Sequence, residues 1–135
     1  MKPPRVRAPA RPAGVKAGWR QALGGQAFRE GHGAEWIAAA WLMLKGYQLL
    51  GFRLKTRGVE IDILARRGST LIVVEVKRRA TMAAALSAID AAQRERLRTA
   101  GAALLRQRPA FAGLRLRIDT VALAPGRFPR HRRDL

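Results

Sequence analysis

The chain has 135 residues, and its 27 Lys and Arg against 9 Asp and Glu give it a formal net charge of +18. This length fits a single domain, and an apolar share of 48% excludes a wholly disordered chain. The absence of cysteine excludes disulfides and thiolate metal sites, and no apolar run is long enough to predict a membrane span. The charge excess favours a polyanionic partner, with nucleic acid first and an anionic membrane surface second.

The two ends of the chain differ in composition from its middle. Residues 1–28 are rich in Pro, Gly, Ala and Arg and show no sustained apolar periodicity, which predicts a flexible basic arm. We expect one folded domain over residues 29–125 and a basic C-terminal tail over residues 126–135. Because the N-terminus lacks a secretory apolar core, we expect a cytoplasmic protein.

The first predicted elements are a helix and a strand. Apolar residues recur at three- and four-residue steps until the stop signal at Lys45-Gly46, which predicts a helix with Glu35 in its first turn. Residues 47–52 predict a strand, with a β-bulge at Gly51. The apolar positions that define the helix are Trp36, Ile37, Ala40, Trp41 and Leu44.

The middle of the chain predicts a β-hairpin, because residues 59–64 and 71–77 are rich in β-branched residues and flank a Gly-containing turn. A short helix over residues 83–89 follows. Asp90 and Gln93 have the spacing of a capping box, which predicts the start of a longer helix. That helix should end before Pro109, and residues 114–122 alternate as a last strand.

The few acidic residues gather in this hairpin. Glu60 and Asp62 lie two apart on one strand and should share a face, as should Glu75 and Lys77 on the next strand. With a turn centred on Arg67-Gly68, Glu60 would lie opposite Glu75. Facing carboxylates destabilise a sheet unless a positive charge lies between them, so a divalent cation is the obvious candidate.

This cluster has the ligand chemistry that Mg²⁺ prefers, which is one or two carboxylates combined with water and substrate phosphate. Asp62 and Glu75 could supply the carboxylates, while Lys77 neutralises a scissile phosphate or orients the attacking water. Glu35 and Glu60 could complete the metal shell. The hypothesis is phosphodiester hydrolysis; the alternative is a solvated strand face on which Lys77 pairs with Glu75 or Glu60.

These residues resemble the PD-(D/E)xK nuclease signature, with Asp62 followed by Glu75-Val76-Lys77. More narrowly, the chain resembles the YraN-like family of predicted endonucleases. The matching segments are Gly31-His32-Gly33-Ala34-Glu35, Arg57-Gly58-Val59-Glu60-Ile61-Asp62, Val74-Glu75-Val76-Lys77-Arg78, Gln93-Arg94-Glu95-Arg96-Leu97 and Arg117-Ile118-Asp119. One departure is Val59, which stands where the family usually has Gly.

The resemblance implies an α/β fold, with a restriction-endonuclease-like core in which helices flank a central mixed β-sheet. It also implies a catalytic set of Asp62, Glu75, Lys77 and Glu35, with Glu60 in support. Within that set, the ligands of Mg²⁺ (or Mn²⁺) would be Asp62, Glu75 and Glu35.

The sequence leaves three hypotheses for function. The first is a metal-dependent endonuclease, acting on DNA in preference to RNA, and the second is a non-catalytic nucleic-acid-binding module with the same fold. The third is a peripheral membrane or ribosome-associated protein that uses its basic ends; a homodimer stays open under each. We interpret Asp119 as structural, paired with an arginine. We assign nucleic-acid contacts to Arg57, Arg78, Arg79, Arg94 and Arg98.

Overall fold

The structure is a computed structural model that describes residues 33–134, so the predicted arm over residues 1–28 lies outside the described residues. The elements run in the order α3 (Gly33–Leu44), β1 (Gln48–Thr56), β2 (Val59–Arg67), β3 (Thr70–Arg78), α4 (Met82–Ser87), α5 (Ala91–Gln107), the 3₁₀ turn η2 (Pro109–Phe111), β4 (Arg115–Leu123) and β5 (Arg130–Arg132). None of the helices in this range has the length and apolar character needed to cross a bilayer.

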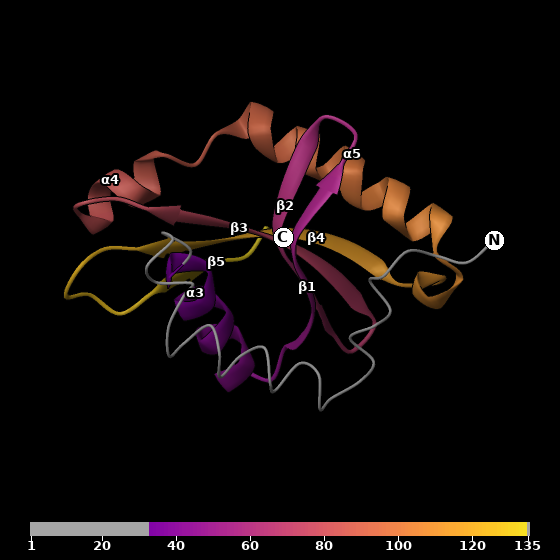
Figure 1. The fold of residues 1–135 in the computed structure, drawn as a ribbon, viewed down its shortest axis with the longest axis horizontal. Coiled ribbons are helices and arrows are strands. Elements are labelled where there is room, and N and C mark those ends of the chain that lie inside the picture. The colour runs from indigo at the N-terminus through magenta and orange to yellow at the C-terminus, as the bar shows by residue number, and fades with distance from the viewer. Residues whose placement is uncertain (1–32, 135) are drawn as a thin grey trace.

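The five strands form one mixed sheet in the order β1-β2-β3-β4-β5. Strands β3 and β4 are parallel and the other neighbours are antiparallel, because the chain crosses through α4 and α5 between β3 and β4. Figure 1 shows α3 against one face of the sheet and α4 and α5 against the other. This arrangement confirms the predicted α/β core with a central mixed sheet flanked by helices.

Strand β3 divides the apolar core into two layers, because its side chains alternate between the faces of the sheet. Ile72 and Val74 pack in the cluster beneath α3, whereas Leu71 and Val73 pack in the cluster beneath α5. Helix α5 lies very close to the sheet at Gly101, where an added Cβ would come within 2.8 Å of Leu116 Cδ1. The sheet is therefore covered on both sides at its centre.

The predicted position of the first helix is confirmed, but its predicted apolar positions are partly wrong. Ile37 and Leu44 are 42% and 82% exposed. The helix instead buries four residues, among them Gly33 and two alanines small enough to let it approach the sheet closely. Trp36 lies at the rim and stacks on Phe52 of β1, with ring centroids 4.4 Å apart. The fully buried residues are Ala38, Ala39 and Leu42.

The predicted hairpin is confirmed, but its turn lies one residue later than expected. Arg67 pairs with Thr70, so Gly68 and Ser69 form the turn, and the φ of +60° at Gly68 suits the glycine that a type II′ turn needs at its first central position. The expectation that Glu60 faces Glu75 is therefore wrong. Extending the register from the Ile63–Val74 pair places Asp62 across from Glu75.

Beyond that pair the sheet forks. Residues 59–61 pair with β1, whereas residues 75–78 pair with β4. Arg53 on β1 has a φ of +51°, and Phe52 and Leu54 on either side of it pack against the α3 and α5 clusters respectively. The side-chain alternation of β2 is interrupted as well, because Ile61 packs in the α5 cluster and Ile63 in the α3 cluster although they lie two residues apart.

The boundaries of the other elements follow their local signals. Strand β1 is longer than predicted, and its register shift between Leu49 and Gly51 confirms the bulge. Asp90 caps α5 by accepting hydrogen bonds from the backbone N–H groups of Ala92 and Gln93. The helix ends at Gln107 because Arg108, which precedes Pro109, adopts an extended conformation.

The expectation of a tail over residues 126–135 is wrong for the part that forms β5, which pairs with β4. Asp119 of β4, 1% exposed, holds this segment in place. It accepts two hydrogen bonds of 2.8 Å from Arg117, one of 2.7 Å from His131 Nε2 and one of 3.3 Å from the backbone N–H of Asp134. The ion pair with Arg117 confirms the structural interpretation of Asp119.

Candidate active site

Asp62 lies where β2 and β3 separate, and its side chain bridges the gap. Its Oδ2 accepts a hydrogen bond of 2.8 Å from the backbone N–H of Val76 on β3. That donor is therefore satisfied by a carboxylate instead of a strand carbonyl. The contact brings Asp62 beside Glu75, the neighbour of Val76, as the sequence led us to expect.

Glu75 is the most unusual carboxylate of the described residues. It is 3% exposed, and neither Oε1 nor Oε2 accepts a hydrogen bond from residues 33–134. The Lys77 ammonium lies 3.0 Å from Oε2 as an ion pair, which balances part of the charge. Burial of Glu75 argues against the solvated-face alternative, because a carboxylate on such a face would be hydrated.

Lys77 is 13% exposed, and a second group fixes its position. Its ammonium donates a hydrogen bond of 2.9 Å to Gln93 Oε1 in the first turn of α5. The capping box predicted from Asp90 and Gln93 is thus only half formed, because the glutamine side chain turns toward Lys77. Sequence reasoning missed this contact, which joins α5 to the acidic cluster.

Glu35 and Glu60 meet at Arg53. The Arg53 Nη1 donates hydrogen bonds of 3.2 and 3.1 Å to the two oxygens of Glu35, and its Nη2 lies 3.9 Å from Glu60. Both acids are close enough to affect the charge of Asp62. Sequence reasoning missed Arg53, since nothing in the local sequence marks a left-handed arginine.

The surroundings of Asp62 favour its protonated form. Burial is the main cause that raises the pKa of Asp62 to about 6, and the negative charges of Glu35, Glu75 and Glu60 add to it, against the lowering effect of the Val76 N–H. The native fold therefore holds a carboxylate that is costly to ionise. A cation placed here would relieve that cost.

We expect Asp62→Asn to stabilise the protein near neutral pH. Since the native pKa lies above the ordinary 3.8, the native state of the wild type loses stability as pH rises from about 4 through about 6. Asparagine can still accept the hydrogen bond from the Val76 N–H, but it cannot ionise. In thermal melts with EDTA, the variant should match the wild type near pH 4 and exceed it by roughly 1–3 kcal/mol at pH 7.5.

The matched control is Asp90→Asn at the exposed cap of α5, where asparagine caps as well as aspartate. The difference in stability between this control and the wild type should not grow between pH 4 and pH 7.5. An Asp62→Asn protein that is less stable than the wild type at pH 7.5 would contradict the assignment of a strained carboxylate.

The donor set fits a hard divalent cation that also binds substrate. No group of three or more Asp, Glu or His side chains within residues 33–134 has the arrangement of a complete ligand set. Asp62 and Glu75 could instead provide two carboxylates, leaving positions for water and phosphate oxygens, as is usual for Mg²⁺. Among residues 33–134, Glu75 Oε1 has neither a hydrogen bond nor an ion pair and Oε2 contacts only Lys77, so Oε1 is available as a ligand.

The five predicted nucleic-acid contacts separate into three groups. Arg94 and Arg98 of α5 both pair with Asp134, and Arg98 also pairs with Glu95, so their charge is partly balanced. Arg78 and Arg79 line a shallow hollow at the end of β3. Arg57, at the turn between β1 and β2, lines a larger groove with other cations.

Proteins of similar sequence were found in comparisons. A sequence model of the Uncharacterised protein family UPF0102 matches residues 34–123. A UPF0102 protein of Caulobacter vibrioides (strain NA1000 / CB15N) is 53% identical over 120 residues, which cover 89% of this chain and 96% of that protein. Another from Caulobacter sp. (strain K31) is 52% identical over 112 residues, covering 83% and 81%. One from Rhizobium etli is 47% identical over 106 residues, covering 78% and 87%.

Proposed function

The chain belongs to the Uncharacterised protein family UPF0102, and from its acidic site we propose that it is a Mg²⁺- or Mn²⁺-dependent endonuclease that hydrolyses phosphodiester bonds. One observation carries the proposal. Glu75 is 3% exposed and accepts no hydrogen bond from residues 33–134, and it lies beside a second, half-buried carboxylate and the lysine with which it forms an ion pair. Such an arrangement costs stability unless a cation or substrate completes it.

Each side chain has a distinct role in this proposal. Asp62 and Glu75 would hold the metal, which when bound supplies Lewis acidity and lowers the pKa of a coordinated water. Lys77 offers its ammonium to a non-bridging phosphate oxygen, where negative charge grows during hydrolysis. Gln93 orients Lys77 through its 2.9 Å hydrogen bond.

The supporting residues tune the charge of the site. Arg53 neutralises much of Glu35 and approaches Glu60, so these two acids do not repel a phosphate as strongly as free carboxylates would. Glu35 could still join the metal shell if Arg53 turned to a substrate phosphate. The net charge of +18 supports a nucleic-acid substrate, and we propose that this substrate is DNA in preference to RNA. We also propose that the protein is cytoplasmic.

The test is cleavage of labelled single-stranded, duplex and branched oligonucleotides of DNA and RNA, with Mg²⁺, Mn²⁺ or EDTA. We expect cleavage that requires metal and falls by about 100-fold or more in Asp62→Asn. Because that variant should be the more stable protein, its inactivity could not be assigned to misfolding. Activity should also rise with pH through about 6, as Asp62 loses its proton.

Two results would end the proposal. Equal cleavage by the wild type and Asp62→Asn would identify a contaminant. Binding of every substrate without cleavage, unchanged in the variant and indifferent to metal, would identify a nucleic-acid-binding module that keeps this fold.

A further inference from the structure

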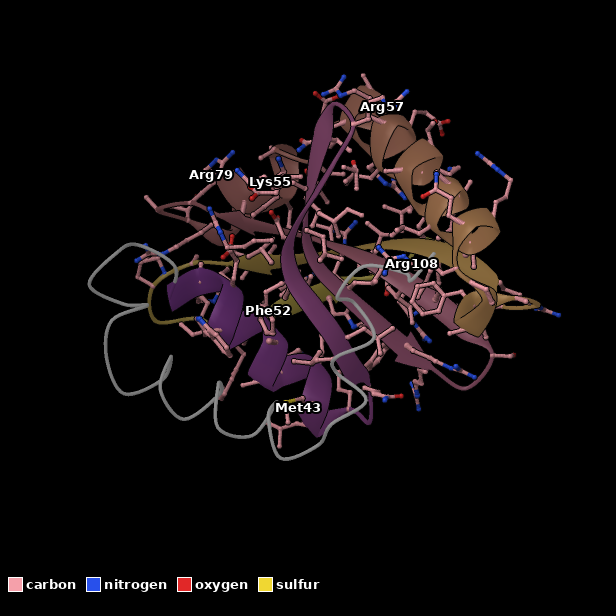
Figure 2. The ribbon with its side chains drawn as sticks, turned by 45° about the vertical axis from the view of Figure 1, so that its right-hand side comes forward. Met43, Phe52, Lys55, Arg57, Arg79 and Arg108 are labelled. Atoms are coloured by element: carbon pink, nitrogen blue, oxygen red, sulfur yellow. The ribbon has the colours of Figure 1, made fainter. Side chains whose placement is uncertain are left out.

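A basic groove lies between the tip of the β1–β2 hairpin and α5. Its volume is about 750 Å³. Figure 2 shows the hairpin standing alongside α5, with Arg57 at the hairpin tip and Arg108 on the side of the helix that faces the hairpin. The groove is hollow because small residues form its floor and walls, among them Gly58, Ala100 and Ala103. Its cationic lining consists of Lys55, Arg57, Arg96, Arg106 and Arg108.

Within residues 33–134, three arginines of this groove are not balanced by acids. None of the described residues that line it is Asp or Glu, and Arg57, Arg96 and Arg106 make no ion pair with the carboxylates of residues 33–134. Elsewhere in the same range some arginines pair with carboxylates, as Arg117 does with Asp119, whereas others, such as Arg127 and Arg132, form no ion pair. What distinguishes the groove is that Arg57, Arg96 and Arg106, without ion pairs in this range, line one recess.

Both walls of the groove lead to the acidic site. On α5, Arg96 lies one helical turn after Gln93, so the two side chains are neighbours on the helix surface. Gln93 contacts Lys77 directly. On the other wall, the hairpin runs from Arg57 into β2, which carries Asp62. The cations from Arg96 to Arg106 extend about 15 Å along the helix.

We propose that this groove binds the phosphate chain of a single nucleic-acid strand and directs it to Asp62, Glu75 and Lys77. The inference deepens the proposed function. Its second part, the delivery of the strand to the acidic site, rests on that function. Arginines spaced along one helix face match the repeating charge of a phosphodiester backbone. The small apolar residues of the floor leave room for sugars and bases.

A single strand suits the groove better than a duplex or a membrane. The volume of about 750 Å³ is that of a pocket for a small ligand, which admits a few nucleotides of one chain but not a double helix. A lipid bilayer presents a flat anionic surface and would engage exposed cations wherever they lie. The cations here line a recess, which favours an extended polyanion.

The test is binding of fluorescent single-stranded DNA and RNA in EDTA, so that cleavage plays no part. The groove variant is Arg57→Glu with Arg106→Glu. The control is Arg127→Glu with Arg132→Glu, which changes the net charge equally at exposed residues that do not line the groove. We expect the groove variant to bind about tenfold or more weakly, with a salt-dependence slope smaller by about 1.4, and the control to change less than about threefold.

Equal loss of binding in both variants would overturn the inference, because it would reflect net charge alone. It would also fail if the groove variant bound single strands normally, or if it lost affinity only for duplexes or for vesicles of anionic phospholipid. Arg57→Gln with Arg106→Gln, a milder pair, should reproduce the loss if the charge-reversed protein proves unstable. Since no metal is present, failure here leaves the proposed cleavage untouched, and failure of cleavage leaves the binding result intact.

Discussion

Glu75→Gln is expected to lower metal-dependent cleavage by about 1,000-fold or more, equivalent to roughly 4 kcal/mol of transition-state stabilisation. Glutamine has nearly the shape of glutamate, so the buried position keeps its packing. What it loses is the negative charge that would hold the cation and that now balances Lys77 at 3.0 Å. The measurement is the single-turnover cleavage rate at saturating Mg²⁺.

The matched control is Glu95→Gln on α5, where the side chain is 72% exposed and pairs with Arg98. It makes the same chemical change outside the acidic cluster, and its rate should stay within about twofold of the wild type. A Glu75→Gln protein that is folded and cleaves at the wild-type rate would show that this carboxylate takes no part in catalysis.

Asp119→Ala is expected to destabilise the protein by about 3–5 kcal/mol, which is about 15 °C or more in melting temperature for a domain of this size. Within residues 33–134, the substitution leaves the Arg117 guanidinium with Tyr47 as its remaining hydrogen-bond partner and leaves His131 of β5 with its Lys45 contact. Burial alone would raise the pKa of Asp119, but hydrogen bonds from His131 and Arg117 outweigh it and hold that pKa below its usual value.

Because the native pKa of Asp119 is lowered, the ionised carboxylate stabilises the fold above the unfolded pKa near 3.8. This stabilisation is lost as pH falls through the native pKa. The difference in stability between Asp119→Ala and the wild type should therefore shrink in acid. Glu95→Ala, at an exposed site, should change the melting temperature little at any pH. A difference of less than about 1 kcal/mol at pH 7 would mean that β5 is held by other contacts.

Local signals predicted most of the fold. The apolar steps of α3, the hairpin glycine, the Asp90 cap and the stop before Pro109 all act within a few residues, so the sequence displays them directly. The register error came from a single turn residue. Placing the turn at Gly68 and Ser69 moves every cross-strand pair, and Asp62 replaces Glu60 opposite Glu75.

The features that sequence reasoning missed depend on distant parts of the chain. Arg53 adopts a left-handed conformation and meets Glu35 from another element. The His131 side chain reaches Asp119 only once β5 pairs with β4, so residues 126–135 looked like a tail. The basic surface of α5 was visible in the sequence, but nothing there placed it across a groove from Arg57.

The acidic site also explains why part of the molecule is less stable than it could be. Asp62 and Glu75 bury charge at the fork of the sheet, where an apolar or amide pair would cost less. Functional sites commonly hold such strained groups, and the gain expected for Asp62→Asn at neutral pH follows from that cost.

Calorimetric titration of Mn²⁺ into the protein, with a non-cleavable oligonucleotide bound, tests the metal site most directly. The wild type should take up the ion with release of protons below pH 6, and Glu75→Gln should show no uptake at the same concentrations. Equal uptake by both proteins, or none by the wild type, would contradict a cation held between Asp62 and Glu75.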